Sequence, residues 1–247
     1  MDNRMNILDI WVDCVNMQQA LSQVESYVVK GKRPYVVLAS NPEKNFSVPN
    51  DPLLYETFKQ ADLLIPDGIG VVEAAKILYG VKLSRVPGVE LMQNICAMAA
   101  QQGYRIFVFG ASEEVSRMAC EKLQRIYSGL NIVGRVNGYL GNDEMPGLVR
   151  EINDSKAQIL FLALGSPKQE KWLSDHVAEL TTVRVCQGIG GTLDTIAGTV
   201  RRAPQLWRQL NLEWLYRLLA EPKRIMRQKL LPIFAVRVLA TKFRTAF

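Results

Sequence analysis

The chain has 247 residues, 48% of them hydrophobic, and a formal net charge of +6. This length and composition exclude a disordered chain and fit one large α/β domain, with or without an appendage. The charge is concentrated at one end: residues 199–247 contain eleven Lys and Arg and two Glu, a net charge of +9, whereas residues 1–198 carry −3. A mildly acidic body with a strongly basic end predicts an anionic partner for that end, either a membrane surface or a nucleic acid.

Apolar runs and helical periodicities alternate along the chain. Strands are predicted at residues 5–12, 34–39, 61–66, 104–110, 157–164 and 183–188, and residues 130–140 as a strand that breaks into a glycine-containing loop. Helices are predicted at about 17–29, 51–60, 70–79, 88–102 and 143–155, and directly after Ser112 and Pro167. This alternation predicts a doubly wound, mostly parallel, Rossmann-like sheet within residues 1–198, followed by a basic helical appendage over residues 199–247.

Nearly every predicted strand ends in a loop that contains glycine or polar residues. These loops are SNPEK (40–44), PDGIG (66–70), FGAS (109–112), NGY (137–139), GSPKQE (165–170) and GIGGTLD (188–194). In an open parallel sheet the ligand crevice lies outside the carboxyl ends of the strands, so we expect these loops to line one crevice rich in amide donors. The substrate-binding residues expected on these strand exits are Gly110, Gly165, Lys168, Glu170 and Gly191.

The loop after the strand at 157–164 is the most informative of these exits. Pro167 suits the first turn of the helix that follows, and a helix N-terminus at the edge of a sheet favours anionic ligands. Lys168, Gln169 and Glu170 add a cation, an amide and a carboxylate there. The pattern fits an anion-binding site, and an ordinary strand–helix junction equally well.

Several catalytic motifs are missing from the sequence. It contains no GxxxxGK[ST] phosphate loop, no GxSxG nucleophile elbow, no DxD triplet for a divalent metal, and no strand that opens into GxGxxG. The single histidine, His176, lies in a predicted helix and is expected to be structural. The four cysteines have no metal-type spacing, so we predict buried free thiols in a reducing compartment and no metal site. Together with the missing motifs, this leads us to expect no cofactor.

Asp67 is the best candidate for acid–base chemistry. It follows a short buried strand, precedes Gly68, and is expected to project into the crevice. The alternative is an ordinary turn aspartate before glycine, which is a common pairing.

The C-terminal segment combines apolar residues at helical spacing with basic residues. Leu210, Trp214 and Leu218 form an apolar stripe, and Pro222 interrupts the helical pattern. Basic amphipathic helices that carry Trp, Leu and Phe are suited to a membrane interface, which we favour. A helix packed on the body with a solvated basic face, or a nucleic-acid-binding arm, are the alternatives.

The N-terminus lacks the apolar core of a signal peptide, and no apolar stretch reaches transmembrane length. We therefore expect a cytoplasmic protein that is peripheral on the inner face of the cell membrane.

The motifs together resemble the WecG/TagA/CpsF family of bacterial glycosyltransferases. The matching text is SNPEK (40–44), ADLLIPDGIGVV (61–72), RVPGVEL (85–91), FVFGAS (107–112), GYL (138–140), LGSPKQEKW (164–172), GIGGTLDTIAGTVRRAP (188–204) and LEWLYRLLAEPKR (212–224). The resemblance covers essentially the whole chain. It implies transfer from a UDP-sugar donor to a polyprenyl-diphosphate-linked saccharide acceptor, in cell-surface polysaccharide or teichoic-acid synthesis, by metal-independent inverting chemistry.

The resemblance also implies roles for individual residues. Asp67 would be the general base, with Asn41 and Gln169 as further catalytic residues. Tyr139 and Asp194 would belong to the nucleotide pocket. The appendage, thought in this family to contact the membrane and close over the active site, would supply the arginines Arg217, Arg224 and Arg227.

One position departs from the family pattern. Ala39 stands where the family has a threonine, and Ser40 beside it should point to the opposite face of the strand. The donor sugar is therefore left open, as is the possibility of a homo-oligomer. The leading hypothesis is a membrane-peripheral glycosyltransferase that does not bind nucleic acid. The alternatives are a nucleotide- or nucleic-acid-binding regulator with a basic C-terminal arm and, with little support, a dinucleotide oxidoreductase.

Overall fold

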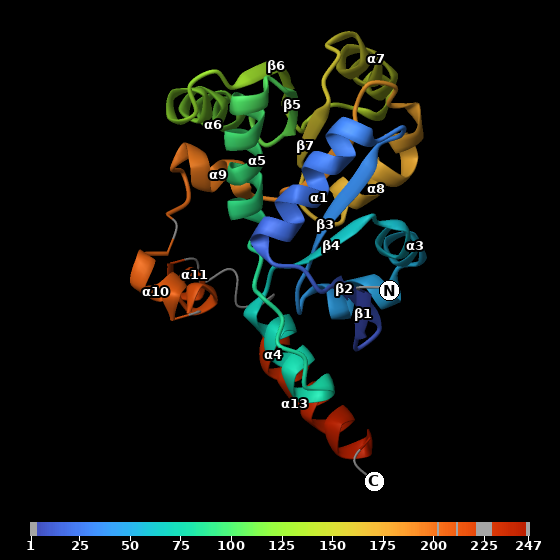
Figure 1. The fold of residues 1–247 in the computed structure, drawn as a ribbon, viewed down its shortest axis with the longest axis vertical. Helices are drawn as coiled ribbons and strands as arrows, with labels where there is room; N and C mark the ends of the chain where they lie inside the picture. The colour runs from blue at the N-terminus through green and yellow to red at the C-terminus, as the bar shows by residue number, and fades with distance from the viewer. Residues whose placement is uncertain (1–3, 202, 211, 221–228, 246–247) are drawn as a thin grey trace.

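A computed structural model describes residues 4–201, 203–210, 212–220 and 229–245. Its centre is a sheet of six strands in the order β4-β3-β8-β7-β5-β6 (Figure 1). The strands are β3 (Tyr35–Ser40), β4 (Leu63–Pro66), β5 (Arg105–Gly110), β6 (Asn131–Val136), β7 (Ile159–Ala163) and β8 (Val185–Gly188). Every neighbouring pair is parallel, which confirms the predicted doubly wound sheet. In the stretch 130–140, predicted as a strand that breaks into a glycine-containing loop, the strand ends at Val136 and the loop follows.

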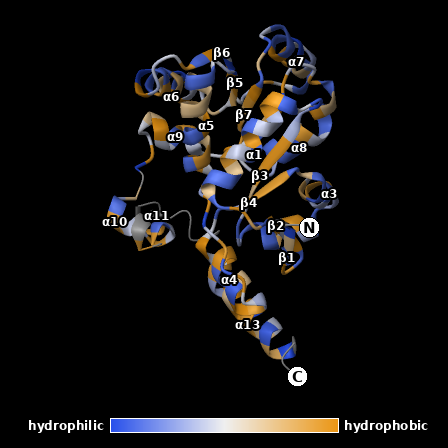
Figure 2. Cartoon of the chain, viewed as in Figure 1, coloured by the Kyte–Doolittle hydropathy of each residue, from blue (hydrophilic) through white to orange (hydrophobic). Residues whose placement is uncertain are grey.

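Helices cover both faces of this sheet. One face packs against α1 (Met17–Lys30), α5 (Gly88–Gln102), α6 (Glu113–Ile126) and α9 (Thr192–Ala197), and the other against α3 (Pro52–Gln60), α7 (Met145–Asp154) and α8 (Lys168–His176). Strand β7 shows why its sequence is a continuous apolar run: Phe161 points to the first core and Leu160 and Leu162 to the second. Figure 2 shows these apolar strands at the centre of the molecule.

The prediction of a single strand over 5–12 is wrong. Two short strands, β1 (Arg4–Ile7) and β2 (Ile10–Asp13), form an antiparallel hairpin that lies outside the main sheet. Leu8 and Asp9 join them with φ angles of 48° and 74°. Left-handed conformations at non-glycine residues are uncommon, so the apolar pattern alone conceals this turn.

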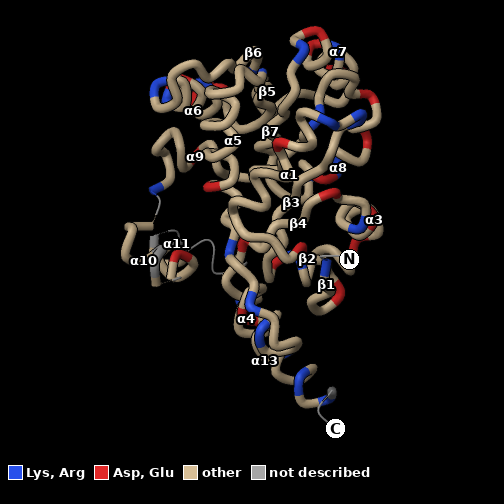
Figure 3. Tube along the Cα trace, in the orientation of Figure 1, with Lys and Arg blue, Asp and Glu red and all other residues tan. Residues whose placement is uncertain are grey.

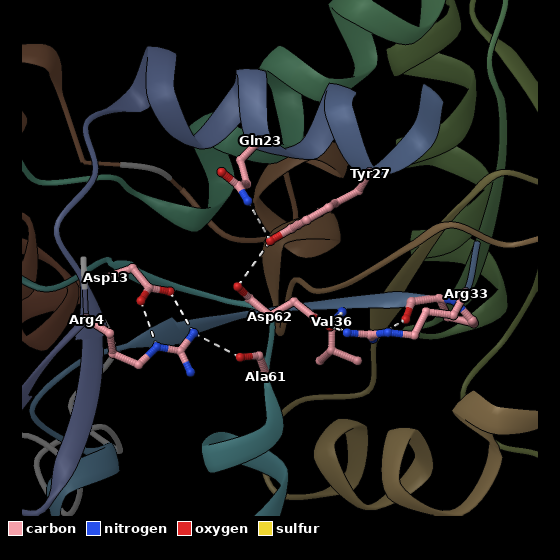
Figure 4. A network of polar contacts seen from close by, with 9 residues as sticks. Arg4, Asp13, Gln23, Tyr27, Arg33, Val36, Ala61 and Asp62 are labelled. Atoms are coloured by element: carbon pink, nitrogen blue, oxygen red, sulfur yellow. Dashed lines mark hydrogen bonds and ion pairs between the residues drawn. The ribbon is translucent and has the colours of Figure 1, made fainter. Parts of the chain in front are cut away.

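A polar network attaches the hairpin to the strand β4 (Figure 4). The Arg4 guanidinium donates to both carboxylate oxygens of Asp13, at 2.7 and 2.9 Å, and to the carbonyl oxygen of Ala61 at 2.9 Å. Asp13 also accepts the backbone N–H of Leu64 at 2.7 Å. The buried carboxylate of Asp13 therefore joins both strands of the hairpin to β4.

Two long helices form an arm that extends away from the sheet (Figure 1). They are α4 (Ile69–Tyr79) and α13 (Leu230–Thr245), which lie side by side because Phe234 and Val238 of α13 are buried in one apolar cluster with Val71 of α4. The remaining elements are short: α2 (Lys44–Ser47), α10 (Gln205–Gln209), α11 (Glu213–Ala220), and the 3-10 helices η1 (Val48–Asn50), η2 (Asn142–Glu144) and η3 (Val177–Glu179). In the part of the chain covered by the structure, no helix is long and apolar enough to cross a membrane.

Candidate active site

Four strands end next to one another at one edge of the sheet: β4, β3, β8 and β7. Asp67 follows β4, Asn41 follows β3, Gly190 follows β8, and Gln169 lies in the first turn of the helix after β7. Because neighbouring parallel strands end at the same edge, the three residues predicted to be catalytic all come from this one edge of the sheet.

Asp67 is held by hydrogen bonds to its carboxylate and to its backbone. The Gly88 N–H donates to the Asp67 carboxylate oxygen Oδ1 at 3.0 Å. Gly88 is the first residue of α5, where the backbone N–H has no partner inside the helix and is available for a carboxylate. The Asp67 N–H donates to the carbonyl of Ser40, and Arg85 Nε donates to the Asp67 carbonyl, at 3.1 and 3.0 Å. The aspartate therefore has a defined orientation at the end of β4.

Gln187 binds the residue that holds the Asp67 carboxylate, and it was not among the predicted site residues. Its side chain is buried in β8, and its Nε2 donates to the carbonyl oxygen of Gly88 at 3.3 Å. The only sequence signal was one amide residue inside an otherwise apolar strand. Gln187 and Asp67 thus bind the two polar groups of the same residue, the carbonyl and the N–H of Gly88.

Asn41 is packed against the loop that carries Asp67. A Cβ atom added to Gly68 would lie 2.9 Å from Pro42 Cδ and 3.3 Å from Asn41 Cβ, so only glycine fits there without displacing its neighbours. The Lys44 N–H donates to the Asn41 side-chain oxygen at 3.3 Å and to its backbone carbonyl at 3.0 Å. These contacts fix the half-buried amide of Asn41 beside Asp67.

Gln169 lies against the end of β8. Its Oε1 accepts the N–H of Gly190 at 3.1 Å, and its Nε2 lies 3.4 Å from the Glu170 carboxylate. A Cβ atom on Gly188 would approach Gln169 Nε2 to 2.7 Å, so glycine at 188 makes room for the amide. Glu170 itself is buried and pairs with Lys44, whereas Lys168 is exposed at the start of α8.

The remaining predicted substrate residues lie around these strand ends. Gly110 has a φ of 126°, and a Cβ there would come within 2.5 Å of the Ala163 backbone, so glycine is needed for β5 and β7 to end together. Tyr139, on the loop after β6, has a side chain that is 81% exposed. Gly165 has a φ of 72°. Gly191 caps α9 and Asp194 lies in its first turn.

The appendage meets this site through Arg85. Nη2 of Arg85 donates to the Glu213 carboxylate of α11 at 3.0 Å, while Nε of the same guanidinium binds the Asp67 carbonyl. Arg85 was not among the predicted site residues: it is 18 positions from Asp67 in sequence, and only the fold brings them together. The side chain of Arg217 is not described, and Arg224 and Arg227 lie outside the described residues.

Ser40 and Ala39 face opposite sides of β3, as predicted. The buried Ser40 hydroxyl donates to the Trp11 carbonyl of the hairpin at 2.9 Å. Ala39 packs against the core under α1 and α5. Ser40 therefore does not replace the hydroxyl that the family threonine would offer.

Other titratable groups are engaged elsewhere. The His176 ring, at the far end of α8, lies 2.8 Å from the Glu179 carboxylate and against Trp172. Burial raises the pKa of Cys96 and of Cys186, and raises that of Cys120 to about 11, so these thiols are not nucleophiles near neutral pH. Within residues 4–245, as far as they are described, no three His, Cys, Asp or Glu side chains form a group that could hold a metal ion.

Comparison with known proteins places these features in a family. The family model described as "Glycosyl transferase WecG/TagA/CpsF family" matches residues 5–247. Curated relatives include an N-acetylglucosaminyldiphosphoundecaprenol N-acetyl-beta-D-mannosaminyltransferase of Staphylococcus aureus strain MRSA252, 32% identical over 241 residues, or 97% of this chain and 93% of the relative. The proteins of the same name from strains NCTC 8325 and COL have the same identity and coverage.

Proposed function

The chain belongs to the WecG/TagA/CpsF family of glycosyl transferases, and we propose that it moves a sugar from a UDP-sugar to a polyprenyl-diphosphate-linked saccharide. Membership of this family makes the chain a glycosyltransferase and decides against the regulator that the sequence left open. The observation that carries the proposal is the oriented carboxylate of Asp67, at the same edge of a parallel sheet as the strand exits that carry Asn41 and Gln169.

In the proposed reaction, Asp67 acts as the general base. Its carboxylate takes the proton from an acceptor hydroxyl while that oxygen attacks the anomeric carbon, and the bond from this carbon to the UDP oxygen breaks with inversion. Gly88 contributes by orienting Asp67, since one carboxylate oxygen is bound by its N–H. Asn41, packed beside the PDGIG loop, is positioned to bind a sugar or acceptor hydroxyl.

The donor diphosphate is assigned to the exits of β7 and β8. Gln169 and the exposed Lys168 lie in the first turn of α8, where the helix dipole favours an anion. Preorganised donors of this kind stabilise the charge that develops on departing UDP. Tyr139 and Asp194 are predicted to contact the nucleoside, and Arg217, Arg224 and Arg227 of the appendage to add positive charge.

Replacement of Asp67 by Asn tests the assignment of the base. Loss of a general base reduces turnover by about 10²- to 10⁴-fold, whereas binding of UDP, measured by calorimetry, should change little. Asp143→Asn, on the exposed helix η2, is the matched control and should leave both quantities unchanged. Turnover of Asp67→Asn close to that of the unmodified protein would show that Asp67 is not the base.

The donor sugar is best sought first among those that the relatives use. The Staphylococcus aureus proteins are named for transfer of N-acetylmannosamine to N-acetylglucosaminyl-diphosphoundecaprenol. We propose a screen of UDP-sugars, with UDP-N-acetylmannosamine first, measured as UDP release with a short-chain prenyl-diphosphate N-acetylglucosamine acceptor. If none of the UDP-sugars in that screen released UDP, the proposed substrate class would be contradicted.

We further propose that the face of α13 remote from α4 rests on the membrane. Ile233, Val236, Leu239 and Phe243 are exposed, and their spacing places them on the side of the helix opposite to the buried Phe234. Arg237, Lys242 and Arg244 lie along α13, and no acidic residue occurs between positions 230 and 245 (Figure 3). An exposed apolar stripe bordered by positive charge is complementary to an anionic lipid surface.

Point substitutions test this membrane contact better than truncation, because removal of α13 would uncover the apolar side of α4. The variant Val236→Glu/Phe243→Glu changes two side chains that are each 65% exposed. We expect it to lose about tenfold or more of its binding to phosphatidylglycerol vesicles in co-sedimentation. Val29→Glu, at a 62% exposed position of α1, is the control. Unchanged sedimentation of the double variant would refute the contact.

A further inference from the structure

A buried ion pair joins two of the motifs at the strand exits. The Lys44 ammonium of SNPEK lies 2.6 Å from the Glu170 carboxylate of GSPKQE, and the two side chains are only 9% and 1% exposed. The ammonium also donates to the Ser166 hydroxyl at 2.5 Å and lies 5.0 Å from the centre of the Phe58 ring. The charge of Lys44 is thus committed to groups of the protein.

Stability alone does not explain this pair. Burial of two charges carries a desolvation penalty, and replacement of such pairs by apolar residues is often neutral or stabilising. In addition, the second carboxylate oxygen of Glu170 is buried without a hydrogen-bond partner among the residues that the structure describes. A buried polar atom of this kind has an energetic cost and calls for an explanation.

The explanation lies in what the pair touches. Through its backbone N–H, Lys44 binds the side-chain oxygen of Asn41, and through Glu170 it reaches the amide of Gln169. The Gln169 oxygen in turn accepts the N–H of Gly190. One continuous set of contacts therefore links the exits of β3, β7 and β8.

We propose that the Lys44–Glu170 pair positions Asn41, Gln169 and the loop at 165–167 for the donor diphosphate, an inference that rests on the proposed function. Glu170 then acts through Gln169 and does not contact substrate, in contrast to the role expected from sequence. The pair is also neutral as a unit, so it places a rigid connection at an anion site without adding a fixed negative charge there.

Three variants separate positioning from a role in stability. Lys44→Met leaves the Glu170 anion uncompensated near the diphosphate, so we expect UDP binding to weaken by about tenfold or more and turnover by about 10²-fold. Glu170→Gln should weaken UDP binding less, because it leaves an unpaired cation. In the double variant Lys44→Met/Glu170→Gln, no buried charge is unpaired, so the urea midpoint should recover, whereas turnover should stay low because Gln169 and the loop at 165–167 are no longer oriented by the Lys44 ammonium.

The matched control is Asp13→Asn, which disrupts a different buried ion pair, that with Arg4 in the hairpin. It should lower the urea midpoint and leave UDP binding unchanged. Recovery of turnover together with stability in the double variant, or unaltered UDP binding in Lys44→Met, would overturn the positioning role. Failure of the unmodified protein to bind UDP would instead contradict the proposed function, so the two failures are distinguishable.

Discussion

The contact between Arg85 and Glu213 yields a prediction about how the appendage is held. Their side chains are 21% and 8% exposed, and Nη2 of Arg85 lies 3.0 Å from the Glu213 carboxylate. A hydrogen bond between charged groups contributes about 1.5–3 kcal/mol, whereas solvent-exposed ion pairs contribute about 0–1 kcal/mol. Because this pair is largely shielded from water, the higher range applies to it.

Glu213→Gln removes the charge and keeps an acceptor oxygen. The free energy that holds α11 in place should therefore fall by an amount near the lower end of that range, about 1.5 kcal/mol. That free energy corresponds to about a tenfold increase in the equilibrium for opening of α11. Hydrogen exchange of the amides of residues 213–220, measured by mass spectrometry, reports this opening directly. Exchange in β7 should stay unchanged, since its protection depends on the two cores of the sheet.

The control is Glu121→Gln, which removes a charge from a helical ion pair with Arg117 whose side chains are 46% and 50% exposed. We expect no measurable change in exchange anywhere in that variant. Exchange of α11 in Glu213→Gln that matches the unmodified protein would refute the reasoning, because the ion pair would then contribute nothing to docking.

Two further predictions concern the hairpin and the base. Asp13→Ala should lower the free energy of unfolding by about 3 kcal/mol, because it leaves Arg4 without its carboxylate partner and the Leu64 N–H buried without an acceptor. Asp13→Asn should lower the free energy of unfolding by less, and equal urea midpoints for the two variants would contradict this reasoning. Gln187→Leu should reduce kcat by about tenfold with little effect on UDP binding, because it removes the hydrogen bond to the Gly88 carbonyl and so weakens the hold of the Gly88 N–H on the Asp67 carboxylate. A change confined to UDP binding would argue against this role.

The sheet could be predicted from sequence because its strands are buried on both faces. The run at 157–164 is apolar throughout since alternate side chains enter two different cores. The hairpin could not be predicted from sequence, because Leu8 and Asp9 adopt left-handed conformations that no apolar pattern encodes. Its strands pair with each other and not with the sheet, and Asp13 contacts β4 through a hydrogen bond between residues 51 positions apart, which no local pattern shows.

The sequence was sufficient to predict which loops line the candidate site. It was not sufficient to predict which side chains contact one another there. Asp67 and Gln169 stood out because each follows a buried strand at the edge where parallel sheets bind ligands. Lys44 and Glu170 are separated by 126 positions, and Arg85 and Glu213 by 128, so only the folded chain brings each pair together. Gln187 lay inside a strand, where an amide gives no sign of its partner.

Two helices of the appendage, α11 and α13, are connected to the loop that carries Asp67. Arg85 connects α11 to the Asp67 carbonyl, and Phe234 of α13 lies 3.7 Å from the position that a Cβ atom on Gly70 would occupy. The PDGIG loop is therefore connected to α11 through Arg85 and lies next to Phe234 of α13. A displacement of either helix would act on this loop, so the docking of the appendage and the backbone that carries the proposed base are linked.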